Sequence, residues 1–308
     1  MKFSKGGLAR LSSTFSIVAY DPVTKDLGVG VQSRYFSVGS AVPWAEAGVG
    51  AIATQSFVNF SYGPKGLALL KRGLSVDEVL KKLTAEDKGR EFRQVGVVDA
   101  SGGAASYTGG SCLEWAGSRT GKWFAAQGNI LTGKEVVDKM AEMYESTKGA
   151  LPDRIMAALK GAQEAGGDAR GRQSSALLVV RKNCKGKGVN RLIDLRVDDH
   201  EDPIGELERL LSMHRLYMLI DEGEEFMARG MNKEALRAIE EAVALNPRSD
   251  DAYIDLGIIN LKVGRRDDAI AAMKKALELN PRMKALIPQL PKSGMMEPDP
   301  DLMRILGL

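Results

Sequence analysis

The sequence has little cysteine and no cysteine pair at metal-binding spacing. Cys112 and Cys184 are the two cysteines among the 308 residues, and neither belongs to a CxxC motif. A disulfide framework and a zinc ribbon are therefore excluded, and this usage is typical of a cytoplasmic protein. No run of about 18 apolar residues and no secretory segment occurs, so we expect no membrane association.

An excess of charge of one sign is also lacking. The 43 Lys and Arg residues are balanced by 40 Asp and Glu residues, which leaves a formal net charge of +3. No basic run is long enough for a nucleic-acid patch, so we expect no nucleic-acid partner. The phosphate-binding patterns G-x-x-x-x-G-K-[ST] and G-x-G-x-x-G are absent too, and we predict no cofactor.

The sequence does contain a β-hairpin near its start, around which the first domain is organised. Residues 14–20, T-F-S-I-V-A-Y, have the period-2 pattern and β-branched content of a strand. Asp21 and Pro22 supply turn chemistry, and residues 27–32 resume as a second strand. The predicted hairpin therefore opens on Thr14.

Blocks of predicted strands and helices follow this hairpin. Ser75 and Glu78 form a capping box at the start of one helix. The order permits an α+β fold in which two antiparallel sheets stack under outer helices, as well as other α+β folds. The predicted elements are strands at 40–44 and 49–56, helices at 62–73 and 75–84, strands at 92–99 and 104–108, short strands near 114 and at 123–127, helices at 133–146 and 151–165, and strands at 175–181 and 191–197.

An internal repeat occupies the C-terminal part. Residues 235–247, A-L-R-A-I-E-E-A-V-A-L-N-P, recur at 269–281 as A-I-A-A-M-K-K-A-L-E-L-N-P, with a period of about 34 residues. This pattern resembles tetratricopeptide repeats and predicts a small all-α domain. Two repeats are fewer than the three or so that are usually needed, so we expect further cover from the helix at 203–219, the tail or a partner chain.

Five motifs of the first domain carry a family resemblance. Together with the hairpin they resemble an uncharacterised family similar to N-terminal-nucleophile (Ntn) hydrolases, domain of unknown function 1028. The resemblance covers about residues 14–205 and implies a four-layer αββα sandwich. The motifs are V-Q-S-R-Y-F-S-V-G (31–39), V-P-W-A-E-A-G-V-G-A-I-A-T-Q-S (42–56), Q-G-N-I-L (127–131), G-G-D-A-R-G-R-Q-S (166–174) and D-L-R-V-D-D-H (194–200).

These patterns divide the chain into four segments. Residues 1–13 are predicted to be a mobile extension, and residues 14–202 to be the Ntn-hydrolase-like domain. The helical repeats occupy 203–287, and the proline-rich tail at 288–308 is expected to be extended before a short apolar end that docks on a groove.

Thr14 is the candidate nucleophile that the resemblance implies. In an Ntn hydrolase the hydroxyl attacks a carbonyl while the residue's own α-amine accepts the proton, so the residue must begin the chain. Thirteen residues precede Thr14 here, and they would have to be removed. The alternative is that Thr14 simply begins an edge strand.

Further catalytic candidates are the polar groups at strand ends. Gln32, Ser33, Gln55 and Asn129 could form an oxyanion hole, or could satisfy strand-end hydrogen bonds instead. Residues 41–53 contain no Lys or Arg that could play the part of the lysine in proteasome-like members. This departure disfavours a protease and favours hydrolysis of a small amide, or no catalysis.

Candidate substrate-binding residues lie at the end of the second strand and in a glycine-rich turn. Arg34, Arg170 and Arg172 could hold an anion with their guanidinium groups, and Asp168 is grouped with them. A structural Asp–Arg pair that holds the turn is the alternative.

A metal site is not predicted, and the weak candidates for one are Asp198, Asp199 and His200. Adjacent residues of an extended chain point to alternate sides, so few of these ligands can converge. A capped domain junction is the alternative.

Two functions remain open on these grounds. The first is a cytoplasmic Ntn-type hydrolase of a small amide or related C–N bond, with a repeat module that binds a protein or peptide or mediates homo-oligomerisation. The second is a catalytically inactive Ntn fold that serves as a binding or assembly platform.

Overall fold

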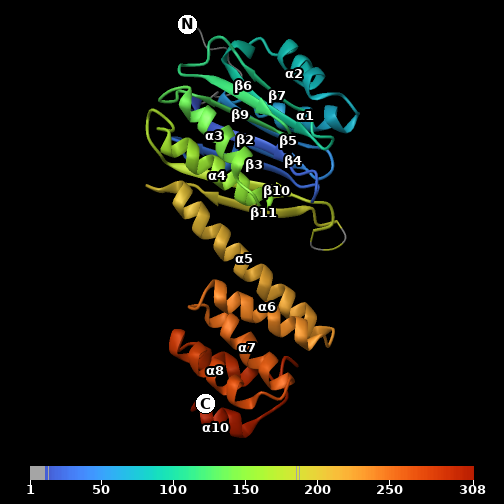
Figure 1. Cartoon of the computed structure of the whole chain (residues 1–308), viewed down its shortest axis with the longest axis vertical. Coiled ribbons are helices and arrows are strands. Elements are labelled where there is room, and N and C mark those ends of the chain that lie inside the picture. Colours follow the sequence, from blue (N-terminus) through green and yellow to red (C-terminus); the bar gives the residue numbers. More distant parts are fainter. Residues whose placement is uncertain (1–10, 13, 185, 187) are drawn as a thin grey trace. The chain divides into compact units, whose positions relative to one another are not determined.

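The computed structural model describes residues 11–12, 14–184, 186 and 188–308, which form two compact units (Figure 1). The first unit ends at Leu210 and the second begins at Leu211, inside helix α5 (Pro203–Ala228). The first turns of α5 therefore belong to the first unit, although the sequence predicted the division after residue 202.

Two antiparallel sheets make up the centre of the first unit. In the described residues, one sheet has the strand order β11-β10-β3-β2-β9-β8, and the other has the order β1-β5-β6-β7 with β4 paired to β5. The strands are β1 (Leu11–Ser12), β2 (Thr14–Tyr20), β3 (Leu27–Ser33), β4 (Pro43–Glu46), β5 (Gly50–Phe57), β6 (Arg93–Asp99), β7 (Ala104–Thr108), β8 (Gly117–Gly121), β9 (Phe124–Asn129), β10 (Ser174–Val180) and β11 (Arg191–Val197).

The sheets face each other through an apolar core. Val18, Val29 and Val31 of one sheet belong to the same buried cluster as Ala51 and Val98 of the other. Because side chains alternate along a strand, the opposite faces of both sheets are left for helices. Helices α1 (Tyr62–Lys71) and α2 (Val76–Ala85) pack on the β5–β7 sheet, and α3 (Glu135–Ser146) and α4 (Leu151–Glu164) pack on the β2–β3 sheet.

Glycine in β3 allows α4 to approach closely. A Cβ atom added at Gly28 or Gly30 would lie 2.6 or 2.3 Å from a side-chain carbon of Ile155. The even-numbered residues of this part of β3 thus face α4, and the odd-numbered ones face the other sheet. The predicted capping box is confirmed at α2, where Ser75 Oγ accepts from the Glu78 N–H and Glu78 Oε2 accepts from the Ser75 N–H at 2.8 Å.

The second unit is helical. Helix α5 extends beyond the predicted end near residue 219 and is followed by α6 (Asn232–Leu245), α7 (Asp250–Lys262) and α8 (Arg266–Leu279). The repeat period is visible in the packing. A Cβ at Gly223 would meet Ile239 at 2.5 Å, and a Cβ at Gly257 would meet Met273 at 2.6 Å. The same close helix crossing therefore occurs in both repeats.

The tail contains more helix than we predicted from its prolines. After α9 (Met283–Leu286), helix α10 (Pro300–Leu306) begins where Asp299 accepts a hydrogen bond from the Leu302 N–H, with Pro300 at its first position. Leu302 and Leu306 are buried in the core of the second unit. The tail thus covers the end of the repeats.

Candidate functional site

Thr14 lies at the head of β2, opposite Ser33 of β3 and Asn129 of β9. It is completely buried, and its hydroxyl donates to Ser33 Oγ at 3.2 Å. Its side chain is on the face of β2 that meets the second sheet, because Gln55 of β5 reaches both its carbonyl and Ser16 Oγ, two residues along the same face. The head of the hairpin is therefore an intersheet site.

Side-chain amides from both sheets surround this position. We call the set the intersheet polar cluster, and all of its members are completely buried. Gln94 is its centre: its Oε1 accepts from Gln55 Nε2 at 2.8 Å and from Asn129 Nδ2 at 3.0 Å, while its Nε2 donates to the Gly128 carbonyl at 2.8 Å. The members are Thr14, Ser16, Ser33, Gln55, Gln94, Gln127 and Asn129.

The cluster contains no ionisable side chain. Its members are hydroxyls and amides, which act as hydrogen-bond donors and acceptors but not as general bases near neutral pH. A proton acceptor for the Thr14 hydroxyl would thus have to come from the backbone, as a free α-amine. In this chain the Thr14 nitrogen is in a peptide bond to Ser13.

The chain arrives at Thr14 from the other sheet. Strand β1 pairs with β5, with Ser12 opposite Ser56, whereas Thr14 begins β2 in the other sheet. The extension predicted over residues 1–13 includes Leu11–Ser12, which form this strand. Its remaining residues lie outside the described residues.

Gln32 is placed apart from the cluster. It pairs with Phe15 and Ser175 and shares the α4 face with Gly28 and Gly30. Its side chain is completely buried, and neither polar atom has a hydrogen-bond partner in the described structure. The structure thus brings Thr14, Ser33, Gln55 and Asn129 together and leaves Gln32 on the opposite face, because a one-residue step along a strand reverses side-chain direction.

The residues that sequence reasoning missed are Ser16, Gln94 and Gln127. Gln127 Nε2 donates to Ser16 Oγ at 2.7 Å. These two residues are paired across β2 and β9, two residues along each strand from the Thr14–Asn129 pair. Two of the missed residues could have been found from the two-residue period of a strand, which places side chains two positions apart on the same face. Ser16 follows Thr14 by two positions, and Gln127 precedes Asn129 by two.

Asp168 organises the glycine-rich turn. It is 3% exposed and accepts from the Arg34 N–H at 2.8 Å and from the Arg170 N–H at 2.9 Å. The Arg170 guanidinium lies 3.3 Å from the same carboxylate, and Arg172 lies 3.4 Å from Asp202. These two guanidinium groups contact carboxylates, whereas the Arg34 guanidinium donates to the neutral Gln173 Oε1 at 2.7 Å.

The three weak metal candidates do not converge. Asp198 accepts from Ser37 Oγ, Asp199 accepts from Gln173 Nε2, and His200 Nδ1 accepts from the Asp202 N–H. Among the described residues, no three or more His, Cys, Asp or Glu side chains are grouped so that they could hold a metal ion.

Comparison with protein families decides the relationship. The model of a family of unknown function, DUF1028, matches residues 14–207. The chain belongs to the DUF1028 family. A tetratricopeptide-repeat model matches residues 226–290, and repeats of this kind suggest a protein partner. A search of the curated proteins finds no match.

A solved structure supports the family and the fold. The crystal structure of a DUF1028 protein from Silicibacter pomeroyi has 31% sequence identity and a TM-score of 0.61, and it covers 66% of this chain and 86% of that one. The fold of the first unit, a mixture of helices and antiparallel sheets, is therefore shared with a member of the family. Within the described ranges, no helix of this DUF1028 protein has the length and apolar character needed to cross a membrane.

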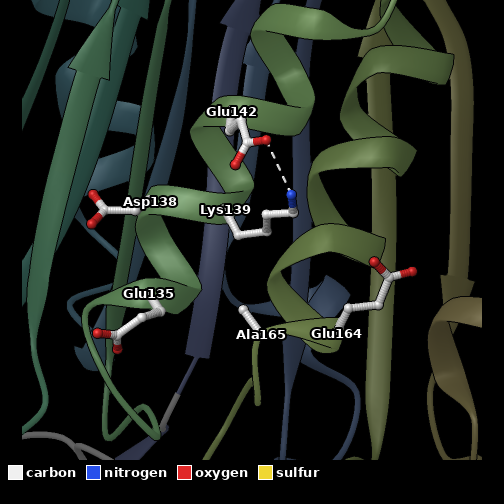
Figure 2. A pocket seen from close by; sticks show the side chains of 6 residues that line it. All are labelled: Glu135, Asp138, Lys139, Glu142, Glu164 and Ala165. Carbon is white, nitrogen blue, oxygen red and sulfur yellow. Dashed lines mark hydrogen bonds and ion pairs between the residues drawn. The ribbon is translucent and has the colours of Figure 1, made fainter.

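A surface pocket of about 370 Å³ lies over α3 and α4 of this DUF1028 protein (Figure 2). Glu135, Asp138, Glu142 and Glu164 line it, and Lys139 is paired with Glu142 at 3.1 Å. These helices cover the face of the sheet opposite to the intersheet polar cluster. The pocket is thus separate from Thr14.

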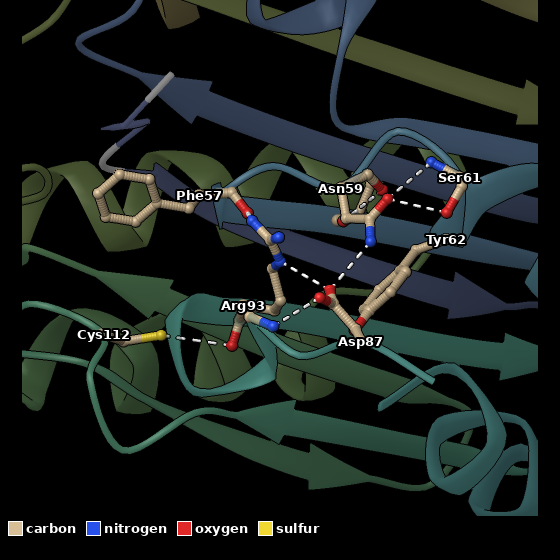
Figure 3. A network of polar contacts seen from close by, with 9 residues as sticks. Phe57, Asn59, Ser61, Tyr62, Asp87, Arg93 and Cys112 are labelled. Atoms are coloured by element: carbon tan, nitrogen blue, oxygen red, sulfur yellow. Dashed lines mark hydrogen bonds and ion pairs between the residues drawn. The ribbon is translucent and has the colours of Figure 1, made fainter. Parts of the chain in front are cut away.

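A second polar network fixes the end of β5 near the β1 pairing (Figure 3). Arg93 Nε donates to Asp87 Oδ2 at 2.8 Å, and its NH1 donates to the Phe57 carbonyl at 2.7 Å. Asn59 Nδ2 and Tyr62 Oη also donate to Asp87 Oδ2. Cys112 Sγ lies 3.3 Å from the Arg93 carbonyl, and burial raises the pKa of this thiol, so it is a poor nucleophile.

Acid should weaken the first unit through Asp87. Burial alone would raise the pKa of this carboxyl, but hydrogen bonds from Arg93, Asn59 and Gly89 hold the pKa well below its ordinary value of 3.8. A group with a lowered folded-state pKa contributes stability above its unfolded-state pKa and loses it as the pH falls towards its folded-state pKa. Asp87→Asn should therefore cost about 2–4 kcal/mol at pH 7, since Arg93 loses its partner.

Urea unfolding between about pH 7 and pH 2 measures this effect. The difference in the free energy of unfolding between the unmodified chain and Asp87→Asn should become smaller below about pH 4. A difference that is the same at all pH values would show that the Asp87 charge is not responsible. Asp77→Asn is a matched control, because Asp77 is exposed on α2 and should have little effect.

Proposed function

We propose that the first unit is a latent Ntn-type hydrolase, with an Ntn-like four-layer αββα sandwich, that acts on a small amide or related C–N bond. Thr14 is its nucleophile, and the activity appears when the residues before Thr14 are removed. The observation that carries this proposal is the Thr14 hydroxyl, which donates a hydrogen bond to Ser33 Oγ in the intersheet polar cluster, whose members carry no ionisable side chain.

The released α-amine supplies the missing base. It accepts the proton of the Thr14 hydroxyl as the oxygen attacks the substrate carbonyl, and the leaving amine takes a proton as the C–N bond breaks. Water then hydrolyses the threonyl ester. The Ser33 hydroxyl and the Asn129 amide, both opposite Thr14 in the sheet, are the proposed donors for the oxyanion.

The neighbouring arginines favour a substrate with an anionic group. Arg34 directly follows Ser33, and within the described residues its guanidinium has a neutral partner rather than a carboxylate. Arg170 and Arg172, which contact Asp168 and Asp202, add positive charge along the same turn. Arg34 is thus the proposed anchor of the anion, and Asp168 holds the turn.

Intact-mass measurement of the isolated protein, with and without a threonine-reactive β-lactone, tests this function. A species that begins at Thr14 should gain one probe mass, while the unprocessed chain should gain none, because its nucleophile is buried. Thr14→Ala should abolish labelling. Ser16→Ala is the control, since Ser16 is buried in the same cluster but cannot become the terminal residue.

A catalytically silent binding platform is the second candidate. The observation that favours it is that Thr14 is completely buried and is preceded by thirteen residues in the sequence. A homogeneous unprocessed mass, no labelling and a fully folded first unit would select the platform over the enzyme.

The second unit is proposed to bind a protein or peptide, in a cytoplasmic protein that forms homo-oligomers. Support comes from the match to tetratricopeptide repeats and from the helix crossings at Gly223 and Gly257. Light scattering coupled to gel filtration tests self-association. If the chain is a monomer at all concentrations, the proposed homo-oligomer is wrong, and the repeats would bind a different protein.

A further inference from the structure

The helices that carry the repeats place acidic side chains on one surface of the second unit. Tyr217 of α5 donates to Asp251 of α7 at 2.9 Å, which brings these two helices together. One repeat period relates Tyr217 to Asp251 and also relates Asp221 to Asp255. The α5–α7 surface therefore presents an aspartate at the same repeat position twice.

Asp255 is the unusual member of this set. It is 4% exposed, and its helix neighbours Ile254, Ile258 and Ile259 are buried with it. No residue of the described structure forms a hydrogen bond or ion pair with its carboxylate. A buried carboxylate without a partner is costly, so the fold alone does not account for this side chain.

The charged groups nearest to Asp255 carry the same sign. Burial and, to a smaller extent, the Glu224 and Asp251 carboxylates together raise the pKa of Asp255 to about 7. Burial, with Asp221 and Asp251, also raises the pKa of Glu224. These shifts show that Asp255 and Glu224 are near other carboxylates of the same charge.

One of these carboxylates, Glu224, lines a pocket. Its volume is about 360 Å³, and its walls include Glu224, Met227, Ile258, Lys262 and Met295. Ile258, which follows Asp255 by three residues on α7, also lines the pocket, so Asp255 lies close to it in the helix. Apolar walls beside carboxylates suit a long aliphatic side chain that ends in a positive charge. Lys262 also lines this pocket.

We propose that the α5–α7 surface receives a lysine- or arginine-bearing segment of a protein partner, whose cation pairs with Asp255, Glu224 and Asp251. The aliphatic part of that side chain packs on Met227 and Ile258. This proposal rests on the proposed role of the second unit in binding a protein. A metal ion is not proposed as the occupant, because among the described residues no three or more His, Cys, Asp or Glu side chains are placed so that they could hold one.

Fluorescence anisotropy with the full chain tests the proposal. The probes are three labelled short peptides of one sequence, in which the charged positions are lysine and arginine, glutamate, or glutamine. The basic peptide should bind, and Asp255→Asn and Glu224→Gln should each weaken it about tenfold. Glu241→Gln, which removes an exposed charge from α6, is the matched control and should leave binding unchanged.

The other possible outcomes contradict the proposal, and they distinguish its failure from failure of the proposed protein-binding role. Equal weakening by Glu241→Gln would mean that net charge alone attracts the peptide. Binding of the acidic or neutral peptide would remove the basic-ligand proposal while leaving the repeats as a protein-binding unit. If none of the three peptides binds to the chain with its circular dichroism intact, both proposals lose their support.

Discussion

Replacing Gln94 by alanine should lower the free energy of unfolding of the first unit by about 4 kcal/mol. Its side chain joins β6 to the ends of β5 and β9, because one amide contacts Gln55, Asn129 and the Gly128 carbonyl. Truncation removes these hydrogen bonds from buried groups and also opens a cavity. Chemical unfolding followed by tryptophan fluorescence measures the loss, since all three tryptophans lie in the first unit.

Two further variants distinguish the hydrogen-bond network from simple packing. Gln173→Ala removes a partly exposed glutamine of the same unit and should cost less than about 1 kcal/mol. Gln55→Leu combined with Gln94→Leu should cost less than the sum of the single changes, because both partners of a buried pair are then apolar. Strict additivity would contradict a coupled network.

Asp255→Asn should stabilise the second unit by on the order of 2–4 kcal/mol at pH 8. The pKa of Asp255 is raised from 3.8 to about 7 in the folded unit. A raised carboxyl pKa means that the folded state binds more protons than the unfolded state between these values, so stability falls as the pH rises from about 4 to about 7. Asparagine imitates the protonated form and removes that loss.

Thermal unfolding of the full chain, followed by circular dichroism, checks this prediction. The gain from Asp255→Asn should be largest above pH 7 and should vanish near pH 4. Glu241→Gln should change the midpoint little at either pH. A loss of stability in Asp255→Asn would mean that the carboxylate has a partner within the unit. Stabilisation together with weaker peptide binding is the combination expected of a residue kept for a ligand.

The sequence predicted best those elements that local chemistry determines. Strand β2 has the predicted bounds, Thr14–Tyr20, because alternating side chains face either α4 or the other sheet. The capping box at Ser75 needs only two residues three positions apart. The repeats were visible in the sequence because each close helix crossing requires a glycine, and Gly223 and Gly257 stand one repeat period apart.

The errors arose where tertiary packing decides. Helix α5 continues beyond residue 219 because its later residues build the first repeat, and the tail forms α10 because Leu302 and Leu306 are buried by the repeats. Gln32 was grouped with Ser33 by adjacency, although adjacent strand residues face opposite sides. Gln94 could not be linked to Thr14, since their proximity depends on how two sheets stack.

The most direct measurement concerns the hydroxyl and amine of Thr14. A chain that begins at Thr14, released by cutting a removable fusion directly before that residue, is treated with a β-lactone and mapped by peptide mass spectrometry. The account predicts one adduct on Thr14, none on the chain that retains residues 1–13, and none after Thr14→Ala. A folded chain beginning at Thr14 that stays unmodified, or is modified only elsewhere, would contradict the proposed nucleophile.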